Sequence, residues 1–196
     1  MARANKAPLE QLVVWRMGTN RNCPGVSQYE TRWGQRSYMV RVEAVNRPQK
    51  RNRSMIIGDL ALVSAALFAG AAFYVNFAEQ PARLKLDDRS LLAQWKPAYK
   101  RGYIMQSTLA IIGFVLGAAA WWLSGILAFL LGAVLMLANW PWTLFGIMPT
   151  NRILMATELQ SAGSASRALL VKWNSLHAVR TGLGAAATLS FLWALA

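Results

Sequence analysis

An uncharged run of 50 residues, Gly102–Asn151, limits most strongly what this chain can fold into. A membrane-spanning helix needs about 20 mainly apolar residues, which rise about 1.5 Å each across roughly 30 Å of hydrocarbon. The run is therefore too long for one crossing and fits two. The turn-forming pair Ser124-Gly125 lies near its middle, and we expect the break there.

Two further segments are long enough to cross a membrane. Leu60–Ala78 has no formal charge over 19 residues, and Leu176–Ala196 has Arg180 as its only formal charge. With the uncharged run, they predict an all-α, integral membrane four-helix bundle. Aromatic residues fall where two interfacial belts are expected, with Tyr74, Trp95, Tyr99, Tyr103 and Trp173 near one membrane face and Trp121, Trp122 and Trp193 near the other. Small residues at helix-packing spacing (Ala61, Ala65 and Ala69; Gly113 and Gly117) are candidate helix contacts.

The basic charge is concentrated at the start of the chain. Residues 1–54 hold 11 basic and 3 acidic side chains, whereas residues 55–196 hold 10 and 5. We divide the chain into a basic N-terminal extension, 1–54, and a four-transmembrane-helix domain, 55–196. The extension is either a disordered arm held near anionic lipid or, as we favour, the result of a start site assigned upstream of Met55. The apolar domain argues against a nucleic-acid partner.

Several classes of site are excluded by residue counts. The single cysteine, Cys23, cannot form an intrachain disulfide or a Cys-based zinc or iron–sulfur site. The single histidine, His177, rules out a poly-His cluster within one chain but leaves a mixed His/carboxylate site open. The chain has no GxGxxG, Walker-type, CxxC or HExxH motif, so it shows no standard nucleotide or metallohydrolase site.

The predicted topology brings polar residues to one membrane face. The connections 79–101 and 149–175 both fall on this face, and the opposite face has only a tight turn and the two ends of the bundle. Ionisable residues inside spans are costly and tend to face the interior of a bundle. All four helices contribute polar groups near this face: Asn76, Glu79 and Arg83 from the first, Gln106 from the second, Asn139, Thr143 and Asn151 from the third, and Asn174, His177 and Arg180 from the fourth.

These residues allow both structural and chemical interpretations. Arg180 either extends to the headgroups or pairs with Glu79 inside the bundle. His177 is either an interfacial histidine or a general base or metal ligand oriented by Glu79, since a carboxylate fixes the tautomer of an imidazole. Asn151 is either the N-cap of a short helix or a binding residue.

Five motifs occur in order along the domain: Glu79-Gln-Pro-Ala-Arg83, Trp95-Lys-Pro-Ala-Tyr99-Lys-Arg101 with Met105-Gln106, Asn139-Trp140-Pro141, Pro149-Thr-Asn151 with Leu154, and Trp173-x-x-Leu-His177-x-x-Arg180. This set resembles the small four-helix membrane family described as anthrone-oxygenase-like, over about residues 55–196. The resemblance implies a four-helix integral membrane protein and, from the fungal branch, oxidation of an anthrone to an anthraquinone by dioxygen. It places the family motifs on Glu79, Arg83, Asn151, His177 and Arg180.

We therefore predict a membrane-embedded oxygenase-like protein that acts with dioxygen on an anthrone-type or other phenolic aromatic compound. His177 would be the base and Glu79 its support, while Arg180 or Asn151 would stabilise the developing oxyanion. The expected substrate-binding residues are Arg83, Gln106, Asn139, Trp140 and Asn76. We favour a reaction without an obligatory cofactor; the alternative is one iron or copper ion held by His177 and Glu79.

A non-enzymatic role is the competing hypothesis. A small permease subunit or a scaffold would use Glu79, His177 and Arg180 as a structural network. In either case the bilayer is the expected partner, in the cell (inner) membrane. The loop face would be cytoplasmic if the chain begins at Met55, whereas the basic residues of the two sides nearly balance if the extension is present. The sequence leaves open whether protomers pair as a homo-oligomer.

Overall fold

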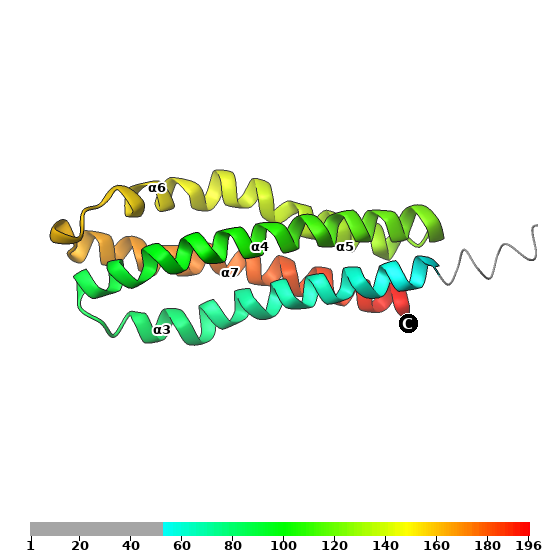
Figure 1. The fold of residues 1–196 in the computed structure, drawn as a ribbon, viewed down its shortest axis with the longest axis horizontal. Helices are drawn as coiled ribbons and strands as arrows, with labels where there is room; N and C mark the ends of the chain where they lie inside the picture. Colours follow the sequence, from blue (N-terminus) through cyan, green and yellow to red (C-terminus); the bar gives the residue numbers. More distant parts are fainter. Residues whose placement is uncertain (1–52) are drawn as a thin grey trace, which may run out of the picture. The chain divides into compact units, whose positions relative to one another are not determined.

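The computed structural model describes residues 53–196. The predicted disordered arm, Cys23 and nearly all of the extension lie outside these residues, so the domain division at 54/55 stays a prediction. Four helices run lengthwise beside one another (Figure 1). Each is long and apolar enough to cross a membrane: Arg53–Arg83, Asp88–Ser124, Leu127–Ala156 and Ser164–Leu195. The predicted all-α four-helix membrane bundle is confirmed.

Several of these spans are divided into shorter elements. The first span ends in a π-helical segment, η1 (Val75–Glu79), and a last turn, α3 (Gln80–Arg83). The second span is α4 (Asp88–Ser124). The third consists of α5 (Leu127–Pro141), the π-helical η2 (Trp142–Ile147) and α6 (Met148–Ala156). A short 3-10 turn, η3 (Leu159–Ser161), precedes the fourth span, α7 (Ser164–Leu195).

The tight turn between the second and third spans lies where the sequence predicts it. Gly125 has a φ of 76°, and its N–H donates to the Trp121 carbonyl at 2.7 Å. Glycine adopts positive φ without the steric cost that a side chain would add. The residue that ends α4 is thus specified by the local sequence.

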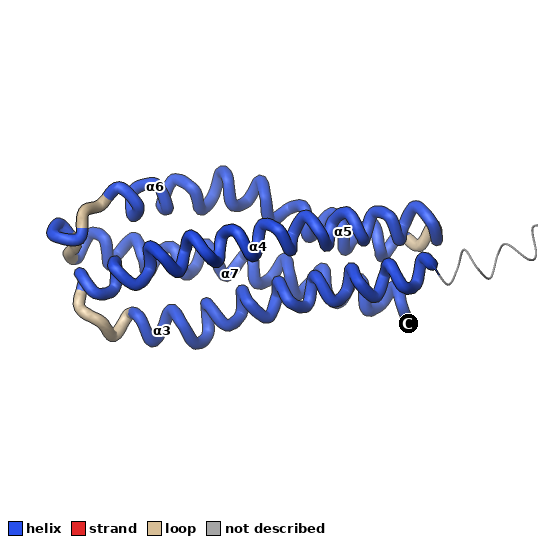
Figure 2. Tube along the Cα trace, in the orientation of Figure 1, coloured by secondary structure: helices blue, strands red, loops and turns tan. Residues whose placement is uncertain are grey.

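The other two connections are much shorter than predicted (Figure 2). They span only residues 84–87 and 157–163, because α4, α6 and α7 continue beyond the uncharged segments. The predicted long loops, 79–101 and 149–175, are therefore wrong. The end of a charge-free run indicates where the hydrocarbon ends, but a helix continues into the polar layer when its cap and packing allow it.

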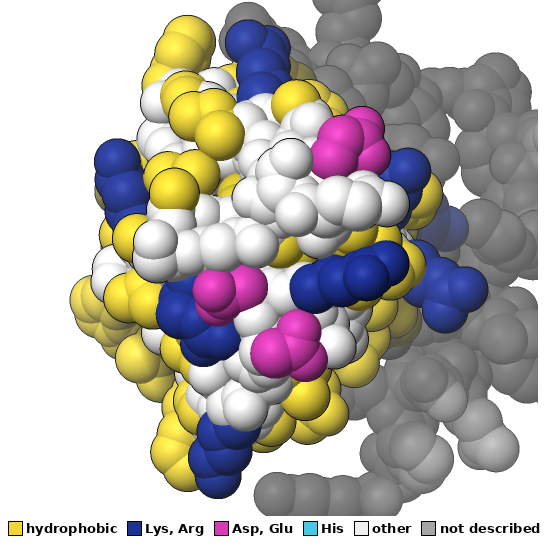
Figure 3. Space-filling model, turned by 90° about the vertical axis from the view of Figure 1, so that its left-hand side faces the viewer, with side chains coloured by type: hydrophobic (Ala, Val, Ile, Leu, Met, Phe, Trp, Pro, Cys, Tyr) yellow, Lys and Arg dark blue, Asp and Glu magenta, His cyan; other side chains and the backbone are white. Residues whose placement is uncertain are grey.

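Side chains fasten this end of the bundle, which we call the loop end. Asp87 caps α4 by accepting hydrogen bonds from the backbone N–H groups of Arg89 and Ser90, at 3.1 and 3.0 Å. Hydrogen bonding to Ser90 lowers the pKa of the Asp87 carboxyl below its ordinary value. Arg167 pairs with Asp88 and donates to the carbonyls of residues 84 and 86, which ties α7 to the first connection. Figure 3 looks onto this end and shows acidic and basic side chains over its surface.

Two π-helical segments share one local cause. The residue just before Pro81 donates its N–H to the carbonyl five residues earlier, Val75, and the residue just before Pro149 does the same to Thr143. Proline has no N–H, so the carbonyl four residues before it lacks its usual α-helical donor. A wider turn at this point lets the helix continue. Pro81 itself lies within the last turn of the first span, which reaches Arg83.

The interior has two separate hydrophobic cores. The membrane core combines Phe68, Phe129, Met136 and Phe191 with small residues of the four helices. Gly117 lies so close to Phe191 that a Cβ there would be 2.7 Å from its ring. Of the predicted stripe residues, Ala61, Ala65, Gly113 and Gly117 are buried and Ala69 is half-buried, so these small residues are helix contacts.

The second core fills the loop end. It is built from larger side chains: Leu91, Leu92, Trp95, Ile147, Leu154, Leu170 and Trp173. Trp95 is 0% exposed and Trp173 5% exposed, so their predicted place in an aromatic belt is wrong. From Asp88 to Gly102, α4 extends about 20 Å before the uncharged run begins, at about 1.5 Å per residue. This polar-layer portion of the bundle needs an apolar interior of its own.

Candidate functional site

A pocket of about 420 Å³, partly open to the outside, lies between the two cores and is lined by all four spans. We call it the main pocket. Its polar lining consists of Glu79, Arg83, Tyr99, Tyr103, Gln106, Asn151, His177 and Arg180. Six of these are residues that the sequence nominates, contributed by helices far apart in the chain. The expected convergence of polar groups therefore occurs, although several of the contacts differ from those expected.

His177 is held by an asparagine of the first span. The ring is 3% exposed, and its Nδ1 lies 2.9 Å from Asn76 Oδ1. Asn76 Nδ2 faces two acceptors, the backbone oxygen and Oδ1 of Asn174, at 2.9 and 2.7 Å. The Thr181 hydroxyl donates to Asn76 Oδ1 at 2.7 Å. Each Asn76 atom thus has partners that suit it, with nitrogen as donor and oxygen as acceptor.

This network defines which nitrogen of the histidine is free. Because Asn76 Oδ1 accepts, His177 Nδ1 must carry the hydrogen. In the neutral ring the lone pair is then on Nε2, which makes no hydrogen bond with any residue of the described range 53–196. Trp173 stacks on the ring at a centroid distance of 4.8 Å and fixes its plane. The result is an oriented imidazole with an available basic nitrogen.

Glu79 does not have the predicted role. Its Oε1 pairs with Arg83, four residues later, and accepts a hydrogen bond from Gln94 Nε2 at 3.2 Å. The prediction that Glu79 orients His177 is therefore wrong, as is its predicted pairing with Arg180. Glu79 lies in η1, where the wide turn breaks the α-helical spacing that would have aligned it with Asn76.

Arg180 is buried without an anionic partner. The residue is 7% exposed, and its guanidinium forms neither an ion pair nor a hydrogen bond with the residues that the structure describes. It lies over the Phe68 ring, with Cζ 5.4 Å from the centroid, in cation–π geometry. Extension to the headgroups, the other expectation, is also wrong because the side chain stays inside. A buried cation of this kind is suited to an anionic ligand or to charge that develops on one.

Two amide side chains add further polar groups to the main pocket. Asn151 lies inside α6 and is 2% exposed, so its interpretation as an N-cap is wrong. Its buried Oδ1 has no hydrogen-bond partner. Gln106 is also buried, and its side chain makes no hydrogen bond within the described part of the chain. Both groups can bind a ligand, because neither is fully used by the fold.

Three aromatic residues, Tyr99, Tyr103 and Trp173, line the main pocket. Trp95 is buried and is not part of the lining; it stacks on Tyr99 at 4.9 Å and meets Trp173 edge-on at 5.8 Å. Trp173 in turn stacks on His177. Planar aromatic surface therefore leads up to the imidazole, and a flat aromatic ligand has complementary faces to stack against.

The donor set does not fit a resident metal ion. Among residues 53–196 no three His, Cys, Asp or Glu side chains are grouped as ligands. Of the two predicted ligands, Glu79 is paired with Arg83 and His177 is held by Asn76. The residues that the structure describes therefore do not supply the ligands expected for the iron or copper site considered from the sequence.

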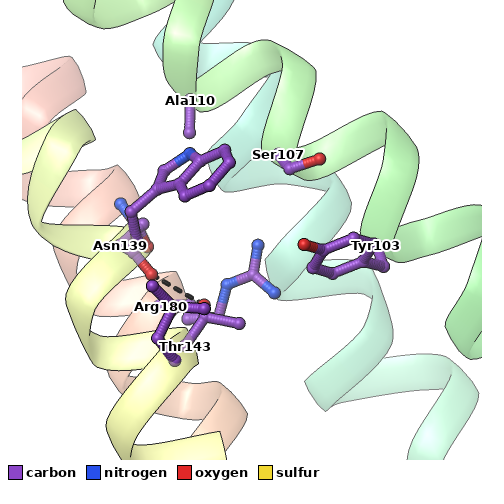
Figure 4. Close-up of a pocket in the computed structure, with 8 residues that line it drawn as sticks. Tyr103, Ser107, Ala110, Asn139, Thr143 and Arg180 are labelled. Carbon is purple, nitrogen blue, oxygen red and sulfur yellow. Dashed lines mark hydrogen bonds between the residues drawn. The ribbon is translucent and has the colours of Figure 1, made fainter. Parts of the chain in front are cut away.

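A second pocket, of about 290 Å³, adjoins the main pocket and shares Tyr103 and Arg180 with it. We call it the side pocket (Figure 4). Asn139 and Trp140, predicted to bind substrate, line the side pocket rather than the main one. Asn76, also predicted to bind substrate, lies behind His177 and contacts that ring instead.

The sequence analysis assigned no functional role to two residues of the histidine network. Asn174 was noted only as part of a polar stripe, and Thr181 was not considered. Both lie on the helix of His177, at positions three before and four after it, so they share its face. That spacing is the signal that could have identified them.

Comparison with known proteins found similar sequences. A family model described as anthrone oxygenase matches residues 95–190. An anthrone oxygenase of Claviceps purpurea (strain 20.1) is 29% identical over 137 residues, which cover 62% of this chain and 78% of that protein. The chain is therefore similar to anthrone oxygenases over residues 95–190, about half of its length. An oxygenase-like role is thereby supported at family level, and no solved structure matches the chain.

Proposed function

We propose that this protein oxidises an anthrone-type compound, or another phenolic aromatic compound soluble in lipid, with dioxygen. The main support is that two groups line the same pocket. One is an imidazole whose Nδ1 is fixed by Asn76, and the other is the guanidinium of Arg180, which has no anionic partner among the described residues. The first suits removal of a proton and the second suits stabilisation of the anion that results.

The first step would be proton abstraction. An anthrone has an acidic methylene between two aromatic rings, opposite a ketone. His177 Nε2 takes one methylene proton, and the electron pair delocalises through the ring onto the ketone oxygen. Arg180 stabilises this oxyanion, with Asn151 as a further polar contact. Burial strengthens the electrostatic interaction, because little water screens it.

The second step would be reaction with dioxygen. The anion transfers electrons to O₂, and a carbon–oxygen bond forms at the former methylene carbon. The histidinium returns its proton to the peroxide, which gives a hydroperoxide. Removal of the remaining hydrogen on that carbon breaks the O–O bond, forms the second carbonyl and releases water. Anthrone and O₂ thus give anthraquinone and water, and no external electron donor is needed.

The surroundings suit such reactants. The apolar membrane core dissolves both a planar aromatic compound and a gas, and the bilayer is the partner of the protein. We place the protein in the cell (inner) membrane. Basic side chains flank the spans at the loop end: Lys85, Arg89, Lys96, Lys100, Arg101, Arg152 and Lys172. The basic residues of the extension nearly balance them on the other side, so the positive-inside rule favours neither orientation for the chain with its extension.

The non-enzymatic alternative lacks a specific supporting contact. A structural network of Glu79, His177 and Arg180 would require these side chains to bind one another. Among the described residues they do not: Glu79 pairs with Arg83, His177 with Asn76, and Arg180 with no carboxylate. The contacts that are present orient the histidine and leave the arginine available.

His177→Ala tests the proposal directly. In purified protein in lipid nanodiscs, we expect wild type to consume oxygen and form anthraquinone from anthrone, and the variant to lose this turnover while keeping its helical circular dichroism. Added imidazole should restore part of the rate by replacing the missing base. His177→Phe, which keeps an aromatic ring against Trp173, is the matched control for packing and should be equally inactive. Turnover retained in His177→Ala would exclude His177 as the base.

A further inference from the structure

The side pocket lies within the hydrocarbon-facing part of the bundle. It is formed between α4 and α5–η2, and every lining residue except Arg180 belongs to the uncharged run 102–151. Ser107 is five residues into that run, about 8 Å along the helix axis at about 1.5 Å per residue. The opposite wall, at Asn139 and Thr143, is also far from any charged residue in the sequence. The pocket therefore faces lipid rather than water.

The pocket has a buried floor and an open rim. Ala110 and Asn139 are each 1% exposed, whereas Leu144 at the rim is 46% exposed. Figure 4 shows Tyr103, Ser107 and Ala110 on one helix, Asn139 and Thr143 on the other, and the Arg180 guanidinium between them. A molecule moving sideways out of the bilayer would meet Leu144 before the buried floor.

Unsatisfied polar atoms indicate what this pocket binds. Asn139 Nδ2 donates to the carbonyls of Leu135 and Met136, at 3.1 and 3.3 Å, which fixes the amide and leaves its buried Oδ1 without a partner. Trp140 Nε1 and Arg180 Nε are buried donors that also lack partners. Unpaired polar groups are unfavourable at membrane depth. A lipid acyl chain would leave all three unpaired, whereas a ring ketone accepts from the donors and a phenol donates to Asn139.

We propose that the side pocket is the entrance and first binding site for a neutral aromatic ketone dissolved in the bilayer. The molecule would bind there by its oxygen and pass Tyr103 and Arg180, which both pockets share, into the main pocket. This inference rests on the proposed function and narrows it: the substrate arrives from lipid in an uncharged form, not from water as a charged phenolic acid.

Two neighbouring residues of α4 provide a matched test. Ser107 and Thr108 both donate their hydroxyls to the Ile104 carbonyl, at 3.1 and 2.9 Å, but only Ser107 lines the side pocket. In proteoliposomes, Ser107→Phe should lower kcat/KM for anthrone by about tenfold or more through slower entry. Its kcat should change little. Thr108→Phe should stay within about twofold of wild type.

A second pair covers the case in which Ser107→Phe fails to fold. Leu144 lines the rim of the side pocket, and Phe145, 81% exposed, does not. Leu144→Trp should obstruct entry, and Phe145→Trp should not. Equal kinetics for both members of either folded pair would overturn the proposed entrance.

A photolabel separates this inference from the proposed reaction. Benzophenone is a neutral, lipid-soluble aromatic ketone whose excited carbonyl inserts into nearby C–H bonds. In proteoliposomes we expect it to label the peptides that carry Ser107 or Leu144, with less labelling in Ser107→Phe and unchanged labelling in Thr108→Phe. Labelling of this kind without anthrone turnover would support the site and refute the proposed function. Anthrone turnover without labelling of these peptides would support the proposed function and refute the proposed entrance.

Discussion

The contact between Asn76 and His177 gives the sharpest prediction. Asn76→Ala removes the oxygen that accepts from His177 Nδ1 and leaves the helix backbone in place. The imidazole then has no partner that distinguishes its two nitrogens. It can rotate, or carry its hydrogen on Nε2, and in either case the base is no longer presented to the main pocket. We expect kcat to fall while KM for anthrone changes little, because the lost contact is behind the ring and not with the substrate.

The size of the effect follows from the bond that is lost. A buried donor left unsatisfied costs about 1–3 kcal/mol. If this whole amount is lost from the orientation of the reactive ring, kcat falls by about 5- to 150-fold, since about 1.4 kcal/mol corresponds to a factor of ten. The Asn76 side chain also donates to Asn174, so some loss of thermal stability is expected as well. Kinetics must therefore be compared at a temperature well below unfolding.

Thr181→Val is the matched control. Its hydroxyl donates to the same Asn76 oxygen at 2.7 Å but forms no hydrogen bond with the imidazole, and valine keeps the shape of the side chain. Anthraquinone formation and oxygen uptake in nanodiscs should show a small decrease for this variant and a large one for Asn76→Ala. Wild-type kcat in Asn76→Ala would refute the orienting role. Equal losses in both variants would show that general packing around the network, and not the histidine contact, controls the rate.

Two further predictions concern charge and packing. Arg180→Met should lower kcat by about 10²–10³-fold if the guanidinium stabilises an oxyanion. Its unfolding temperature should be unchanged or higher, because no ion pair is broken. Arg83→Met removes an ion-paired residue and should lower the unfolding temperature. A stability loss for Arg180→Met as large as that for Arg83→Met would instead indicate a structural role. Gly132→Ala places a Cβ 2.4 Å from the Phe191 ring and should destabilise the bundle by about 1–3 kcal/mol. Gly182→Ala is the control, because no atom lies within 4 Å of the position that its Cβ would take. This change should leave the stability unchanged or raise it. Equal unfolding temperatures for the two glycine variants would contradict this packing.

The sequence predicted the number and order of the helices because their signal is local and strong. An uncharged run longer than one crossing, with the Ser124-Gly125 pair at its break, leaves few other arrangements. Helix ends were predicted poorly at the loop end. There the helices continue through residues such as Lys96 and Arg167, whose charges in the sequence indicated loops. Lys96 instead donates to the carbonyls of Met155 and Thr157, a contact between distant segments that no local pattern reveals.

The sequence predicted most of the polar residues that line the candidate site, but not which of them contact one another. Six nominated residues line the main pocket, because polar groups within long apolar spans have few other places to lie. Glu79 was assigned to His177 because a carboxylate can fix the tautomer of an imidazole. Asn76 and Glu79 both lie in the π-helical segment Val75–Glu79, and Asn76 is the residue that reaches the imidazole. A π-helical turn depends on the tertiary fold as well as on the proline that follows it, so periodicity alone could not show it.

The position of the site between two cores bears on why an unpaired arginine is retained. Both cores consist of apolar side chains, and Arg180 contacts the membrane core at the Phe68 ring by a cation–π contact. In the empty protein the buried guanidinium is unfavourable, and a methionine of similar volume would avoid the desolvation of a charge. The interaction becomes favourable when negative charge develops beside it, which is the condition for stabilising a transition state more than a ground state. An oriented imidazole in the same pocket supplies the means to create that charge. A residue that weakens the fold and is useful only during a reaction is better explained by catalysis than by assembly of the bundle.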